Sequence, residues 1–167
     1  MSHDPVRTKK DFKEITRRGR CVVTCEFDPG KSILFVSHPV ALTLSTAGDI
    51  DDYYGEVRNA WYRLCNGRRI FAVVDLTNLL VDVDASLSDY HARSIRTAED
   101  ECAIATVRYG GSMLQRTMSR MAAIGRSERS NVCRSRDEAI ALVRELQQRG
   151  AASPESRFSP RQSLSPS

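Results

Sequence analysis

The sequence lacks any apolar run near the roughly 18 residues that would cross a membrane as a helix. Its opening residues, as far as Glu14, are polar and charged and contain no apolar core of a secretory signal. We therefore expect a cytoplasmic protein with no membrane span.

The sequence also lacks a paired cysteine motif. Its five cysteines, at positions 21, 25, 65, 102 and 133, form no pair with two residues between them. Cys21 and Cys25 would lie about 13 Å apart on one face of a strand that rises roughly 3.3 Å per residue, too far apart to share a metal. We expect packed, reduced thiols that behave as small apolar side chains, with no metal and no cofactor.

Motifs of catalysis are missing as well. The run Gly110-Gly111-Ser112 has neither the spacing nor the lysine of a phosphate-binding loop, and Gly125-Arg126-Ser127 is no nucleophile elbow. The histidines at positions 3, 38 and 91 share no motif. We expect a protein that is not an enzyme and has no catalytic residues.

Charge is unevenly distributed along the chain. From Gly48 to Glu101 there are eleven acidic and six basic residues, whereas from Ala103 onward eleven arginines face five acids. One surface is therefore expected to be acidic and another basic. The arginines are not interleaved with aromatic residues, so a nucleic-acid partner is not indicated.

Hydrophobic periodicity predicts the order βββαβαβαβα. Alternating or fully apolar runs predict strands, and apolar residues spaced three and four apart predict helices. The residues from Ile70 to Val74 are uninterruptedly apolar, which is typical of a strand buried on both faces. The predicted strands are residues 21–27, 32–36, 40–45, 68–76, 102–107 and 131–133, and the predicted helices are residues 48–64, 86–101, 112–125 and 139–150.

This order predicts one α/β domain at residues 20–150. Its sheet is mixed and mainly parallel, with an N-terminal antiparallel meander formed by the first three strands and about four helices. Residues 1–19 form a charged N-terminal segment. Residues 151–167 are too polar and too rich in Ser and Pro to bury a core, and we expect a disordered tail.

Two segments carry a resemblance to a known family. The run from Phe71 to Asp84, FAVVDLTNLLVDVD, resembles the central strand and following helix entry of STAS domains. The run from Val132 to Val143, VCRSRDEAIALV, is similar to the closing strand and helix of their SpoIIAA-like members. The resemblance covers roughly residues 20–147 and implies the STAS/SpoIIAA-like fold.

The resemblance also implies a function. In the antagonist branch of the family, a Ser or Thr after the central strand is phosphorylated by a partner kinase, and the phosphate switches partner binding off. Here Asp84 occupies the acceptor position, so Ser86 and Ser88 are the phosphorylation candidates. The resemblance implies a regulatory module that binds a protein partner, such as an anti-sigma factor or a kinase-type signalling protein, and is compatible with a homodimer. The partner-binding candidates are Asp82, Asp84, Ser86, Ser88 and Tyr90.

Two alternatives remain open. Asp82 and Asp84 follow the central strand, where paired carboxylates could hold a metal or act as acid and base, although turn and helix-capping roles are commoner there. Met113, Met118 and Met121 share one predicted helical face. Core packing is the simpler explanation of that stripe, but it could also line a pocket for a small apolar or lipid ligand between the sheet and this helix.

Overall fold

The computed structural model describes residues 11–81, 85–113, 115–117 and 131–150 of the 167-residue chain. Most of the N-terminal segment, the predicted tail, and the candidates Asp82, Asp84, Met118 and Met121 lie outside these residues. The strands are β1 (Asp11–Arg17), β2 (Arg20–Asp28), β3 (Ile33–Ser37), β4 (Leu42–Leu44), β5 (Ile70–Asp75), β6 (Leu79–Val81), β7 (Ala103–Tyr109) and β8 (Val132–Cys133). The helices are α1 (Ala47–Leu64), α2 (Ala85–Cys102) and α4 (Arg136–Gly150), and residues 115–117 are helical as well.

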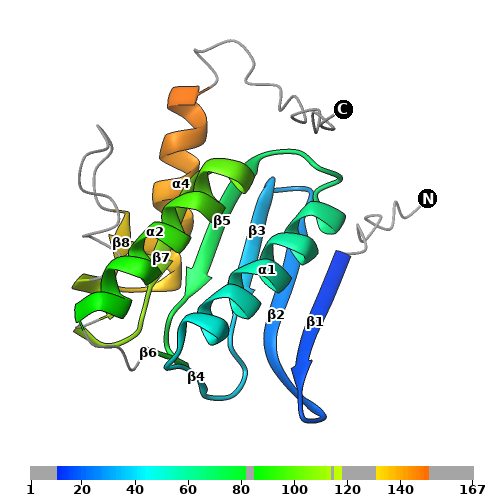
Figure 1. Cartoon of the computed structure of the whole chain (residues 1–167). Coiled ribbons are helices and arrows are strands. Elements are labelled where there is room, and N and C mark those ends of the chain that lie inside the picture. The colour runs from blue at the N-terminus through cyan, green and yellow to red at the C-terminus, as the bar shows by residue number, and fades with distance from the viewer. Residues whose placement is uncertain (1–10, 82–84, 114, 118–130, 151–167) are drawn as a thin grey trace, which may run out of the picture.

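Six strands form one mixed sheet in the order β1-β2-β3-β5-β7-β8. The first three strands pair antiparallel, and β3, β5, β7 and β8 pair parallel. Helices α1 and α2 lie side by side on one face of this sheet, and α4 covers the other (Figure 1). The predicted α/β class, with a mainly parallel sheet after an antiparallel meander, is confirmed.

The membership of the meander differs from the prediction. Its first strand is β1, and the predicted third strand at residues 40–45 pairs elsewhere: β4 runs parallel to β6 in a separate two-stranded sheet. The hairpin from β1 to β2 turns through Arg18 and Gly19, whose φ angles are 51° and 75°. Positive φ at both central residues is what a two-residue hairpin turn requires.

The alternation of side chains along the central strands divides the core into two layers. Leu34, Val36 and Ala72 face α1 and α2, whereas Phe35 and Val73 face α4. The apolar run of β5 is buried on both faces, as its composition predicts. On the α4 side, Ala139 and Val143 are fully buried against the sheet.

Helix-capping residues set the beginnings of α1 and α4. Thr46 caps α1: its Oγ1 accepts from the Asp49 amide at 3.1 Å, and the Asp49 carboxylate accepts from the Thr46 amide at 3.1 Å. At α4, Ser135 Oγ accepts from the Glu138 amide at 3.2 Å, and the Glu138 carboxylate accepts from the Arg134 amide at 2.9 Å. None of the helices in the described ranges is both long and apolar enough to cross a membrane.

Candidate functional site

A turn packs at the carboxyl ends of β5 and β7, the edge of the sheet where open α/β folds usually place their sites. Asp75 ends β5, and its Oδ1 accepts from the Thr77 amide at 2.9 Å and from Thr77 Oγ1 at 2.5 Å. A Cβ on Gly110, which follows β7, would lie 2.6 Å from Thr77 Oγ1. The Asp75 carboxylate therefore braces a turn.

His38 follows β3 and is held at both ring nitrogens. Its Nδ1 lies 2.8 Å from the carbonyl oxygen of Asp75, and its Nε2 lies 2.9 Å from the Tyr53 hydroxyl. Because a carbonyl only accepts, Nδ1 carries the proton and Nε2 accepts from Tyr53. Burial lowers the pKa of His38, which favours this neutral form.

A second pair of this kind joins α1 to α2. The Tyr54 hydroxyl lies 2.9 Å from His91 Nε2, and the rings of Tyr53 and Tyr54 pack edge to face at 4.9 Å. Burial, assisted by the positive charge of Arg108, lowers the pKa of His91 to about 4. His91 is therefore a neutral, buried side chain at pH 7.

Tyr90 connects the predicted docking segment to α1. Its hydroxyl donates to the carboxylate of Asp51, which lies 39 residues earlier in the chain. This hydrogen bond raises the pKa of Tyr90. Asp51 and Asp52, near the beginning of α1, and Asp89, near the beginning of α2, are exposed. We call the side chains of Asp51, Asp52, Asp89 and Tyr90 the acidic face.

Of the other predicted partner-binding residues, Ser86 and Ser88 lie within the described residues. Ser86 and Ser88 lie in the first turn of α2, and the Ser88 side chain is partly exposed. Because the helix begins at Ala85, neither serine is its N-cap.

The sequence analysis did not select Asp51 and Asp52 as partner-binding residues. The excess of acidic residues between Gly48 and Glu101 was the signal in the sequence that pointed to them.

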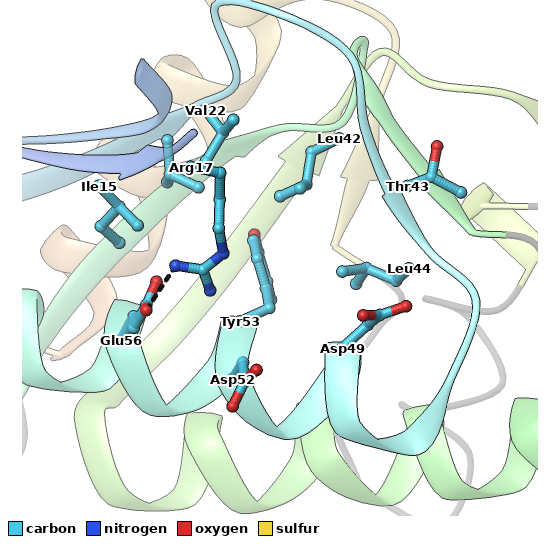
Figure 2. Close-up of a pocket in the computed structure, with 11 residues that line it drawn as sticks. Ile15, Arg17, Val22, Leu42, Thr43, Leu44, Asp49, Asp52, Tyr53 and Glu56 are labelled. Atoms are coloured by element: carbon cyan, nitrogen blue, oxygen red, sulfur yellow. Dashed lines mark hydrogen bonds and ion pairs between the residues drawn. The ribbon is translucent and has the colours of Figure 1, made fainter. Parts of the chain in front are cut away.

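A groove adjoins the acidic face at Asp52. Figure 2 shows Arg17 reaching from β1 to Glu56 of α1, where its Nη1 lies 2.6 Å from Oε1. The groove has a volume of about 50 Å³, and carboxylates outnumber its single arginine. Its lining residues are Ile15, Arg17, Val22, Val23, Leu42, Thr43, Leu44, Asp49, Asp52, Tyr53 and Glu56.

The methionine stripe is represented by one described side chain. Met113 is 76% exposed, so it does not lie in a closed pocket.

The five cysteines form no disulfide, and burial raises the pKa of Cys25 and Cys65 to about 12. In the part of the chain that the structure describes, no group of three His, Cys, Asp or Glu side chains could hold a metal ion.

Comparison with known proteins gives a solved structure with a similar fold. No family model matches the chain, and no curated protein matches it. A solved structure of an uncharacterized protein from the DUF3478 family of Shewanella loihica, described as having a SpoIIAA-like fold, covers 86% of this chain and 98% of its own. The TM-score is 0.48 and the sequence identity is 14%, so no conclusion about activity follows.

Proposed function

We propose that this protein is a regulatory, non-enzymatic module that binds a protein partner through the acidic face. The hydrogen bond between Tyr90 and Asp51 carries the proposal, because it joins the beginning of α2 to the beginning of α1 in one surface. The proposal extends the docking segment predicted after the central strand to include α1.

The hydrogen bonds and the burial of the two described histidines support a binding function over a catalytic one. Both ring nitrogens of His38 are occupied, and His91 is 3% exposed with a pKa of about 4. A general base at neutral pH needs a free lone pair near the reacting proton and a pKa near 7. Neither ring has both properties.

The charge of the acidic face defines the chemistry of the partner. Asp52 and Asp89 are exposed carboxylates, so the complementary surface carries Arg or Lys. Charge pairs at the rim of an interface act mainly on the association rate and weaken as salt is added. A signalling protein of the anti-sigma or kinase type with a basic docking surface fits this description.

Ser86 and Ser88 lie at the beginning of α2, near the acidic face, and we propose them as candidates for phosphorylation. A phosphate on Ser86 or Ser88 would lie in the first turn of α2, where the helix dipole favours negative charge. On Ser88 it would be adjacent in sequence to the exposed Asp89 and would change the charge that the partner meets. Phosphorylation is therefore the switch that we propose for this face.

The test is capture of a partner from an extract of the source cells on immobilised full-length protein. Asp52→Arg and Asp89→Arg reverse a charge on the acidic face, and Glu145→Arg makes the same reversal on α4, across the sheet. We expect one partner to be recovered by the wild type and by Glu145→Arg, and at least tenfold less of it by the other two. Recovery should fall as salt rises from about 0.05 M to about 0.5 M. Equal recovery by all four proteins would refute the proposal.

A further inference from the structure

A second cavity lies between the sheet and the two helices α1 and α2. Its volume is about 50 Å³. Val57 and Trp61 of α1, Ile95 of α2, and Val36 and Val74 of the sheet supply much of its lining. These side chains make the cavity mainly apolar.

Two polar groups in its wall have no hydrogen-bond partner among the described residues. They are the indole Nε1 of Trp61 and the hydroxyl of Thr106, on side chains that are 6% and 7% exposed. Leaving a buried donor unpaired is costly, and native proteins seldom do so without a reason. The indole N–H can only donate, so the missing partner must be an acceptor.

The cavity offers no place for a further charge. Its wall includes three charged side chains, and all of them are already paired: Arg108 lies 2.6 Å from Glu99, and Arg58 lies 2.8 Å from Glu101. An added ion would therefore enter without a free counter-charge, which is expensive in an apolar interior. A neutral occupant is favoured.

Water molecules in this cavity would find too few hydrogen-bond partners. A volume of this size holds about three or four water molecules, each of which seeks about three hydrogen bonds. The wall contributes only two unpartnered groups against an apolar lining. A molecule with an apolar body and one accepting oxygen matches the wall better.

We propose that this cavity binds a small neutral molecule of about three to five non-hydrogen atoms, of the ketone, aldehyde or alcohol class. Its oxygen accepts from Trp61 Nε1 and from the Thr106 hydroxyl, and its body packs on Val57, Val74 and Ile95. This site is independent of the proposed docking surface, and its failure would leave that proposal untouched.

Trp61 is the sole tryptophan of the chain, so its indole N–H gives one assignable resonance in a nitrogen–proton correlation spectrum. The probes are three molecules of similar shape: acetone, isobutene, which has no oxygen, and acetate, which is charged. We expect acetone to shift the indole resonance saturably at millimolar concentration, and isobutene and acetate to bind at least several-fold more weakly. Thr106→Val should weaken acetone binding several-fold, and Thr106→Ser, which keeps the hydroxyl, should retain it.

Thr97→Val provides the matched control, because the Thr97 hydroxyl is exposed on α2 and donates to the carbonyl oxygen of Arg93. It should leave acetone binding unchanged. The proposal is overturned if the acetone shift is linear in concentration, if isobutene binds as well as acetone, or if a crystal soaked in acetone holds only water in the cavity. The comparison of probes uses the wild-type protein and so does not depend on the folding of any variant.

Discussion

Arg108 of β7 donates to the carboxylate of Glu99 of α2, with Nη2 and Oε1 2.6 Å apart. The side chains are 13% and 16% exposed. Burial alone would lower the pKa of Arg108, but the negative charge of Glu99 outweighs it and raises that pKa. The pair ties α2, the helix that carries Asp89 and Tyr90, to the sheet on which this helix packs.

Removing one partner of this pair is expected to be strongly destabilising. Glu99→Gln leaves the Arg108 charge buried without its counter-charge, and we expect the free energy of unfolding to fall by roughly 3 kcal/mol. Glu101→Gln is the control, because Glu101 pairs with Arg58 at 2.8 Å at a site that is 51% exposed and should contribute under about 1 kcal/mol. Urea unfolding followed by circular dichroism measures both. Equal losses would mean that burial of the Arg108 pair has no energetic consequence.

His91 should make the stability depend on pH. Its pKa is about 4 in the folded protein against an ordinary value of 6.5, so between these values the unfolded chain binds more protons. This contribution is complete above pH 6.5 and is lost as pH falls toward 4, by up to about 3 kcal/mol. His91→Gln should flatten this dependence, with the part due to His38 remaining. Parallel stability curves of the two proteins between about pH 7.5 and about pH 5 would contradict the assignment.

Two glycines should respond in opposite directions to the same substitution. Gly111 has a φ of +75°, and a Cβ there would lie 2.7 Å from the Cβ of Leu76, which cannot move without the backbone. Gly111→Ala should therefore cost about 3 kcal/mol. Gly55 lies within α1 with nothing within 4 Å of an added Cβ, so Gly55→Ala should stabilise by roughly 0.5–1 kcal/mol. Thermal melts of both variants check the two signs.

The sequence predicts the layered fold well because local patterns determine most of it. The uninterrupted apolar run of β5 is compatible only with a strand buried on both faces, and the three-and-four spacing of α1 only with an amphipathic helix. Both elements form within a few residues of the predicted bounds. Strand β1 escaped prediction because Lys13, Glu14 and Arg17 give it the charged composition of an exposed edge strand. The hairpin turn at Arg18-Gly19 also lacks the usual Asn or Asp before its glycine.

The candidate site was less predictable, since its contacts join distant parts of the chain. Tyr90 and Asp51 are 39 residues apart, and His38 and Asp75 are 37 apart. No local spacing reveals such pairs. The wrong pairing of the strand at residues 40–45 has the same origin: alternation shows that β4 is a strand, but its partner β6 lies beyond α1 and β5.

Hydrogen–deuterium exchange on the complex with the captured partner tests the docking surface most directly. We expect binding to slow exchange of the amides at residues 47–56 and 85–92, the beginnings of α1 and α2 that carry the acidic face, and to leave α4 unchanged. The protection should disappear in the Asp52→Arg protein. Protection confined to α4, or to the outer edge of β1, would place the partner elsewhere and contradict the proposed function.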